Sequence, residues 1–216
     1  MSAVHLFIDF VLHLDRHLGG IIQDYGVWTY AILCLIIFCE TGLVFLPLLP
    51  GDSLLFAAGS FAALGSLNPV LLFALLAAAA IVGDNVNYWV GRTIGPRAFS
   101  GQLSFLKQRH LDRTRAFFAR HGARTIVLAR FVPIVRTFTP FVAGVGAMKY
   151  PRFLSYDVGG GVLWVGLFTA AGYFFGNLPS VRHNFSLVIL AIILISVIPM
   201  AAEMWRQRSA PTKENG

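Results

Sequence analysis

Six long apolar stretches constrain this chain more than any other feature of its sequence. They lie at about 27–46, 47–67, 70–91, 125–147, 153–176 and 185–205. A helix of roughly 20 apolar residues crosses the hydrocarbon core of a bilayer. Charged residues make up only 12% of the chain, whereas about a quarter of the residues in a typical soluble domain are charged. The sequence therefore predicts an all-α polytopic membrane protein.

The N-terminal segment is predicted to lie on the membrane surface rather than to be a cleaved signal. Residues 2–15 contain no Lys or Arg, and no small-residue cleavage site follows a clean apolar run. Residues 1–24 are predicted to form an interfacial amphipathic helix. Its apolar residues recur at helical spacing: Val4, Phe7, Ile8, Val11, Leu14 and Leu18. The membrane domain would then span residues 25–205, followed by a tail at 206–216.

The net charge of +7 is concentrated in one connection, at residues 92–124. Its eight basic residues are opposed there only by Asp112, and they are Arg92, Arg97, Lys107, Arg109, Arg113, Arg115, Arg120 and Arg124. Such a cluster is typical of a cytoplasmic loop. No stacking aromatics interleave it, so nucleic-acid binding is not expected. Trp205 and Arg206 likewise predict a cytoplasmic C-terminus.

Prolines interrupt two of the apolar stretches. Residues 45–52 read FLPLLPGD and residues 130–140 read RFVPIVRTFTP. Because proline removes a backbone donor and clashes with the preceding turn, neither stretch is expected to be one straight helix. Irregular backbone at membrane depth must be covered by protein or face a water-filled cavity. We predict two re-entrant helical hairpins, at about 47–67 and 125–147, shaped by Pro47, Pro50, Gly51, Pro133, Pro140 and Gly144.

The number of membrane crossings supports the second hairpin. If the loop at 92–124 and the C-terminal tail are both cytoplasmic, an even number of crossings must separate them. A full span at 125–147 would give three crossings, whereas a hairpin there leaves two. The stretch 125–147 is therefore predicted to return to the side from which it enters.

The two halves of the membrane domain repeat one spacing. Pro69 precedes the first glycine of Gly91-Arg-Thr-Ile-Gly95 by 22 residues, and Pro151 precedes that of Gly172-Tyr-Phe-Phe-Gly176 by 21. Gly-x-x-x-Gly is a common helix-packing motif. Repeated at matched distance after a broken stretch, it predicts a duplication, which would be inverted if one hairpin enters from each side, as in many secondary transporters.

Four charged residues fall within the broken stretches, namely Glu40, Asp52, Arg130 and Arg136. An ionisable group at the bilayer centre costs roughly 2.5–3.5 kcal/mol even on lenient scales, so these groups must be paired, hydrated or neutralised. A guanidinium fork matches phosphate oxygens, and a carboxyl in apolar surroundings can exchange a proton near neutral pH. We therefore predict that the two arginines bind a phosphate and that the two acids couple to protons.

Other interpretations of the charged residues remain open at this level. Two ion pairs could simply hold the hairpins together. Asp84, with Asn85 and Asn87, is predicted either to line the same cavity or to cap a helix end at the interface, and the interface is favoured. No metal site or cofactor is expected, since His13 and His17 lack a nearby third ligand. No enzyme motif is present, so the chain is not expected to be an enzyme.

The two charged motifs resemble those of a known family. Residues 40–52, ETGLVFLPLLPGD, and residues 130–144, RFVPIVRTFTPFVAG, are similar to the two signatures of DedA (SNARE-associated, VTT-domain) membrane proteins. The resemblance implies opposing re-entrant hairpins and lipid transport, with essential charges at Glu40, Asp52, Arg130 and Arg136. It also implies recycling of undecaprenyl phosphate driven by the proton motive force, as in bacterial members of the family. The family often has Glu in place of Asp52 and Gly in place of Ala129.

Together these features predict a proton-coupled flippase for an anionic lipid, with undecaprenyl phosphate favoured, in the bacterial cytoplasmic (inner) membrane. The alternative is a non-catalytic membrane-homeostasis protein or a general phospholipid scramblase, in which the charges are structural. The expected partners are the bilayer and an anionic lipid. The identity of the lipid, the direction of transport and any homo-oligomer are left open by the sequence.

Overall fold

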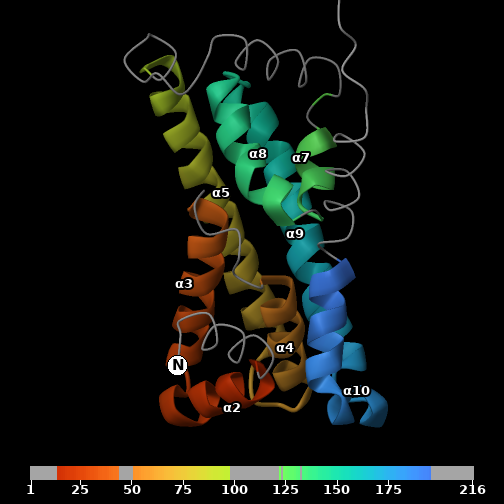
Figure 1. Ribbon diagram of the computed structural model, residues 1–216. Helices are drawn as coiled ribbons and strands as arrows, with labels where there is room; N and C mark the ends of the chain where they lie inside the picture. Colours follow the sequence, from red (N-terminus) through yellow and green to blue (C-terminus); the bar gives the residue numbers. More distant parts are fainter. Residues whose placement is uncertain (1–13, 44–50, 98–121, 123, 132, 196–216) are drawn as a thin grey trace, which may run out of the picture.

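The computed structural model describes residues 14–43, 51–97, 122, 124–131 and 133–195, and the regular structure in these ranges is helical, with no strand. Two long helices dominate it, α5 (Pro69–Arg97) and α9 (Tyr150–Phe175). They run side by side in opposite directions along the molecule (Figure 1). Their segments Pro69–Ile94 and Tyr150–Phe175 are each 26 residues long and apolar enough to cross a membrane. The predicted all-α class and the stretches at 70–91 and 153–176 are thus confirmed as long apolar helices.

Local sequence signals set the start of each long helix. The side-chain oxygen of Asn68 accepts hydrogen bonds from the backbone N–H groups of Val70 and Leu71, both at 3.0 Å. This is a helix N-cap, and Pro69 occupies the first helical position, where its missing N–H costs nothing. In α9, Pro151 lies in the first turn in the same way. Pro69 and Pro151, the two prolines of the repeated spacing, therefore mark the beginnings of the two long helices.

Shorter helices form two groups at opposite ends of the molecule. The helices α3 (Trp28–Gly42) and α4 (Gly51–Ala63) lie beside the half where α5 begins, and α7 (Arg124–Ala129) and α8 (Pro133–Val145) lie beside the half where it ends. In Figure 1, α3 runs toward the middle and α4 runs back, and the same holds for α7 and α8 from the other end. Each pair of short helices thus reverses direction near the middle of the molecule.

The positions of the breaks differ in part from those predicted. Within the predicted hairpin at 47–67, Gly51–Ala63 is one continuous helix, and the chain reverses between α3 and α4, the connection that contains Pro47 and Pro50. The break in 125–147 is confirmed, because α7 ends at Ala129 and α8 begins at Pro133. Pro140, predicted to help shape the hairpin, lies inside α8. Pro47 and Pro50 lie outside the described residues.

Three further segments complete the described chain. The helix α2 (Leu14–Tyr25) lies across the end of the bundle near α4 (Figure 1), and its Leu18 is buried, as expected for an apolar face. The short α10 (Pro179–His183) follows α9, and the apolar helix Phe185–Ile195 follows α10. The rest of the predicted N-terminal helix, His13, most of the basic loop and the tail lie outside the described residues.

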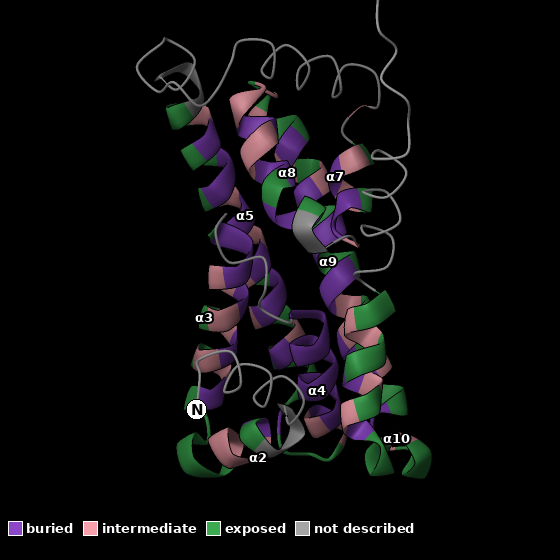
Figure 2. Cartoon of the chain, in the orientation of Figure 1, coloured by how far each residue is buried: buried purple, intermediate pink, exposed green. Residues whose placement is uncertain are grey.

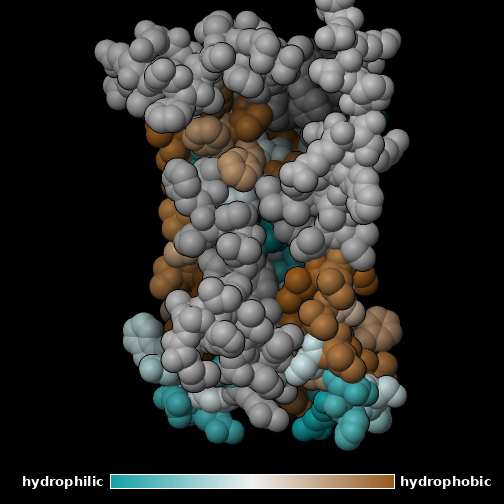
Figure 3. Space-filling view, viewed as in Figure 1, coloured by the Kyte–Doolittle hydropathy of each residue, from teal (hydrophilic) through white to brown (hydrophobic). Residues whose placement is uncertain are grey.

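The interior and the flanks of the molecule are both apolar. One hydrophobic cluster joins α3, α4, α5, α9 and the last apolar helix through buried side chains that include Ile37, Leu55, Leu76, Trp164 and Ile189. Buried residues line the inner faces of these helices (Figure 2). Large apolar side chains are also exposed on the outside, and hydrophilic residues gather at the end near α2 and α10 (Figure 3). An apolar exterior with a polar end fits a protein whose flanks contact lipid.

Glycines bring α4 and α9 into close contact. A Cβ atom on Gly59 would overlap the backbone carbonyl of Thr169, and one on Gly172 would overlap that of Phe56. Small residues of this kind let two helix backbones approach in a membrane, where packing rather than the hydrophobic effect holds helices together. Gly172 begins one of the two Gly-x-x-x-Gly motifs, so this motif packs α9 against α4.

The contact between α5 and α8 repeats that between α4 and α9. A Cβ atom on Gly91 would overlap the backbone carbonyl of Phe141, and one on Gly144 would overlap that of Tyr88. In both contacts, the glycine of one helix lies against a residue that stands three positions before the glycine of the other helix. The short helix of each half therefore packs on the long helix of the other half. Gly144, predicted to shape a hairpin, serves this helix packing.

Replacement of Gly172 by alanine tests the contact between α4 and α9. We expect Gly172→Ala to lower the free energy of unfolding by about 1–3 kcal/mol, the usual cost of overpacking. The matched control is Gly159→Ala in the same helix, where no atom lies within 4 Å of the added Cβ. Thermal unfolding followed by circular dichroism in detergent should show a lower midpoint for Gly172→Ala alone. Equal midpoints for the two variants would contradict the close contact.

Candidate functional site

Arg136 and the two predicted acids form a buried cluster where three helices meet. Glu40 lies near the end of α3, Asp52 in the first turn of α4 and Arg136 in the first turn of α8. The Nη1 atom of Arg136 lies 2.8 Å from Oδ1 of Asp52, and its Nη2 atom is paired with Oε1 of Glu40. All three residues are buried. The predicted pairing of the two acids with an arginine of the second broken stretch is therefore present for Arg136.

Trp164 of α9 closes the cluster around Arg136. Its indole Nε1–H donates a hydrogen bond to Oδ1 of Asp52 at 2.8 Å. The Cζ atom of Arg136 lies 4.4 Å from the centroid of the indole ring, a cation–π arrangement. Trp164 itself is fully buried. One side chain therefore fixes both the carboxylate and the guanidinium, and the sequence analysis did not identify it.

Gly51 at the start of α4 positions the Glu40 carboxylate. Its backbone N–H donates to Oε1 of Glu40 at 3.2 Å. A helix N-terminus presents free N–H groups and a partial positive charge, so a carboxylate is stabilised there. A Cβ atom on Gly51 would overlap the Glu40 carboxylate. Gly51 is thus required for the close approach of this acid.

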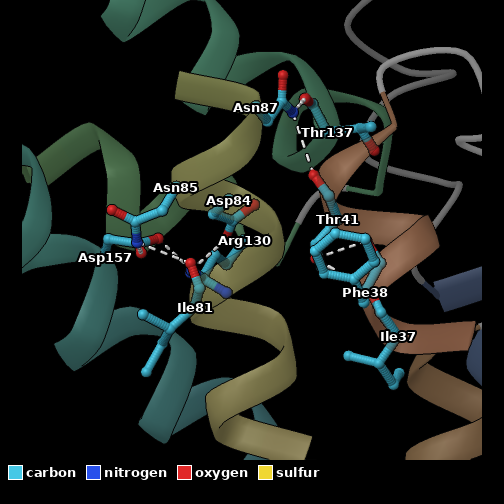
Figure 4. A network of polar contacts seen from close by, with 10 residues as sticks. All are labelled: Ile37, Phe38, Thr41, Ile81, Asp84, Asn85, Asn87, Arg130, Thr137 and Asp157. Atoms are coloured by element: carbon cyan, nitrogen blue, oxygen red, sulfur yellow. Dashed lines mark hydrogen bonds and ion pairs between the residues drawn. The ribbon is translucent and has the colours of Figure 1, made fainter. Parts of the chain in front are cut away.

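Arg130 belongs to a second cluster, formed with acids other than those predicted. Its Nη2 atom is paired with Oδ2 of Asp84 on α5 and with Oδ1 of Asp157 on α9 (Figure 4). Arg130 itself follows the last residue of α7, and all three residues are buried. The two arginines of the second motif therefore serve two different acidic pairs.

Polar side chains extend the Arg130 cluster toward the outside of the bundle. The Nδ2 atom of Asn85 donates to Oδ2 of Asp157 at 3.3 Å and to the carbonyl of Ile81 at 2.7 Å. The hydroxyl of Tyr150 donates to Oδ1 of Asn85 at 2.8 Å. A continuous chain of hydrogen bonds thus leads from Tyr150 through Asn85 to the buried Asp157.

Asn87 connects three helices beside the clusters. Its Nδ2 atom donates to the carbonyl of Thr41 on α3 at 3.1 Å and to the carbonyl of Thr137 on α8 at 2.7 Å (Figure 4). Both carbonyls lie one residue after a charged residue of the first cluster, Glu40 or Arg136. Asn87, predicted as a cavity-lining residue, therefore holds together the backbones that carry these charges.

Asp84 shows where the favoured interpretation of the sequence was wrong. It was expected to cap a helix end at the membrane interface, but α5 continues past it to Arg97, and Asp84 is 1% exposed. Asp157 was not singled out at all. The signal for it was available, because it is an acidic residue within the apolar stretch 153–176, and an ionisable residue in such a stretch demands a partner.

Several polar atoms of the two clusters are buried without a protein hydrogen-bond partner among the described residues. They are Oε2 of Glu40, Oδ1 of Asp84, Oδ1 of Asn87, Nε of Arg136, and Nε and Nη1 of Arg130. Buried polar groups normally have a partner, which can be water or a ligand. The arginine N–H donors are therefore available to water or to the oxygen atoms of a substrate, and the oxygen acceptors are available to water.

The fold and the site define a helical membrane protein with charges buried inside its bundle. The family model of the VTT domain matches residues 49–174. Over 216 residues the chain is 52% identical to Protein DedA of Escherichia coli, covering 99% of both chains. The chain belongs to the DedA family of VTT-domain membrane proteins, which confirms the resemblance seen in its two motifs.

More distant relatives extend the comparison. Over 171 residues the chain is 48% identical to an uncharacterized membrane protein of Mycobacterium leprae, covering 79% of this chain and 77% of the relative. Over 195 residues it is 30% identical to inner membrane protein YghB of E. coli, covering 90% and 86%. No solved structure matches the chain.

Removal of the Arg130 charge tests the second cluster. We expect Arg130→Met to destabilise the fold by about 3–5 kcal/mol, because two buried carboxylates lose their cation. Adding Asp84→Asn and Asp157→Asn to Arg130→Met should restore much of the loss, since no uncompensated charge then remains. The exposed Lys149, replaced by methionine, is the control. Unfolding midpoints in detergent measure the effect, and a triple variant no more stable than Arg130→Met would contradict the pairing.

Proposed function

We propose that the protein carries an anionic lipid across the membrane by proton-coupled transport, and that it does so without catalysis. Undecaprenyl phosphate, a lipid with one phosphate headgroup, is the substrate we favour. The observation that carries the proposal is the composition of the two buried clusters. Each contains one guanidinium and two carboxyl groups, all enclosed by the helices of the bundle.

The charge balance of each cluster provides a place for a proton. If both carboxyls are ionised, one arginine leaves a net charge of −1 in each cluster. An unbalanced charge in apolar surroundings is costly, and a group in that position usually neutralises instead. Binding of one proton to either carboxyl removes the excess charge. Each cluster therefore alternates between a state that holds a proton and a state that has released it.

Phosphate and proton binding are linked through the arginines. A phosphate needs the same guanidinium donors that the carboxylates now occupy. A carboxyl that takes up a proton weakens its hold on the arginine and frees donors for phosphate oxygens. Departure of the proton restores the ion pair and expels the phosphate. Glu40 and Asp52 would act in this way on Arg136, and Asp84 and Asp157 would do the same for Arg130.

The helix arrangement supports an inverted repeat built around two re-entrant hairpins. The pairs α3–α4 and α7–α8 enter from opposite ends and reverse near the middle of the molecule, and the glycine contacts of one half recur in the other. In secondary transporters with this design, the substrate site lies at the midplane and access alternates between the two sides. We place the protein in the bacterial inner membrane, with the loop 92–124 and the C-terminus in the cytoplasm.

A second candidate is a scramblase or membrane-homeostasis protein in which the charges only hold the fold together. The observation that favours it is that each arginine already has two carboxylate partners within the protein. Buried ion pairs of this kind can specify a structure without binding any substrate. The two candidates differ in whether a pH gradient drives movement of the lipid.

Reconstituted liposomes test the proposal directly. Labelled undecaprenyl phosphate is placed in one leaflet, and its arrival in the other is followed with a pH gradient of either sign. We expect transport to be several-fold faster with one polarity than without a gradient, and a protonophore to remove the difference. A rate that is independent of the gradient would support the scramblase instead.

Two variants separate transport from structure. Arg130→Lys keeps the positive charge but loses the bidentate fork, so we expect it to insert and fold normally yet lose at least tenfold in transport rate. The combined variant Glu40→Arg with Arg136→Glu preserves an ion pair at the first cluster. If the charges are only structural, this charge swap should retain activity, whereas the proposed mechanism requires that it be inactive. The exposed Lys149→Arg serves as the control for both.

A further inference from the structure

An open cavity lies on the outside of the bundle between the second half of α5 and the start of α9. Its volume is about 640 Å³, within the range of small-molecule binding sites. We call it the α5–α9 groove, and it is lined by Ile81, Val82, Asn85, Val86, Trp89, Val90, Thr93, Tyr150 and Leu154. None of these residues is one of the charged groups of the two clusters.

The outer wall of the α5–α9 groove is apolar and exposed. Val82, Val86 and Val90 are 54%, 41% and 38% exposed, respectively. They lie in the segment Pro69–Ile94, which is long and apolar enough to cross the membrane. An apolar hollow on such a segment faces hydrocarbon, so its occupant is a lipid chain or a helix of another protein.

The inner wall of the groove is polar and leads to the Arg130 cluster. Tyr150 and Asn85 both line the groove and are hydrogen-bonded to each other at 2.8 Å. Asn85 in turn donates to Asp157, which is paired with Arg130 (Figure 4). An apolar helix of another protein would gain nothing from this hydrogen-bonded connection, whereas the polar headgroup of a lipid could follow it into the bundle.

A cation, Arg92, lies beside one lining residue of the groove without being a lining residue itself. The Cζ atom of Arg92 lies 5.9 Å from the ring centroid of Trp89, a lining residue. Its Nη1 atom donates to the hydroxyl of Tyr88 at 2.9 Å and to the carbonyl of Met148 at 3.2 Å. None of the ion pairs found among the described residues includes Arg92. Its other donors are therefore available to an anion.

The corresponding cavity in the other half of the molecule lacks these polar groups. It has a volume of about 340 Å³ and lies between the start of α5, α4 and the end of α9. At the repeat spacing of 81 residues that separates Gly91 from Gly172, it has Gly166 in place of Asn85 and Ala170 in place of Trp89. Tyr173 stands where the first half has Arg92. The cation and the polar inner wall are thus specific to the α5–α9 groove.

We propose that the α5–α9 groove binds a phosphate-bearing membrane lipid, with its hydrocarbon chain along the valine wall and its phosphate at Arg92. The charge of Arg92 selects this occupant over a helix of a second copy, because an apolar helix would offer the guanidinium no anion. From Arg92 the headgroup has a polar route past Tyr150 and Asn85 to Arg130. Only this last step rests on the proposed function, since binding in the groove requires no transport.

Binding of a defined phosphate lipid to the full chain in maltoside detergent tests the groove. The probe is dodecyl phosphate, and dodecylphosphocholine and inorganic phosphate are the comparisons, each measured by native mass spectrometry. We expect dodecyl phosphate to bind wild-type protein at least tenfold more tightly than either comparison. Val86→Trp, which fills the groove, and Arg92→Gln, which removes the cation, should each weaken its binding at least tenfold.

Matched variants control for the fold. Leu167→Trp places the same bulk at the equivalent exposed position of the other half and should bind like wild type. Arg92→Lys should retain most of the affinity for dodecyl phosphate. Binding that is unchanged in Arg92→Gln, or equal for phosphate and phosphocholine headgroups, would overturn the proposal. So would a dimer cross-linked through Val86→Cys in liposomes, because a second copy would then occupy the groove.

The outcomes also separate the groove from the proposed function. If wild-type protein binds dodecyl phosphate in the groove but moves no undecaprenyl phosphate in liposomes, the transport proposal fails and the groove stands. If Val86→Trp and Arg92→Gln bind dodecyl phosphate like wild type while the wild-type protein moves undecaprenyl phosphate, the groove proposal fails and transport stands.

Discussion

Two arginines facing four carboxyl groups are the interaction on which the rest of this structure depends. Each guanidinium lies at or near a point where the chain changes direction, and each is held by acids from two other helices. Without a cation, the acids would be unpaired in apolar surroundings, which costs several kcal/mol for each group. The Arg136 pairs thus tie the short helices α3, α4 and α8 to one another, and the Arg130 pairs tie the end of α7 to the long helices α5 and α9. The same positions have polar atoms left for a substrate.

Much of this architecture could be predicted from the sequence because apolar length, proline and glycine act locally. The starts of α5 and α9 and the break before Pro133 follow from a cap or a proline within a few residues. Pro140 lies inside α8 because an internal proline costs one backbone hydrogen bond, which a packed helix can tolerate. Packing against α5 is a tertiary property that no local pattern shows.

The partners of the charges were harder to predict than their positions. Burial of Glu40 and Arg136 follows from their place in apolar stretches, and their pairing follows from opposite charge. The sequence offers no comparable reason to assign Arg130 to Asp84 and Asp157 rather than to Asp52. The choice of partners depends on the rotation of α5 and α9 about their axes. That rotation is set by the glycine contacts of α5 with α8 and of α9 with α4. Trp164 was missed for the same reason, since an aromatic residue in an apolar helix is usually only a packing residue.

The glycine contacts have a consequence for how the molecule can move. Since each short helix packs on the long helix of the opposite half, neither half is an independent body that could rock against the other. Such interlocking resembles a domain swap within one chain. A change of access must then come from sliding or tilting of α4 along α9 and of α8 along α5. Backbones in contact at glycine can shear in this way because no side chains interdigitate there, so the smallest residues in the chain would set the direction of its motion.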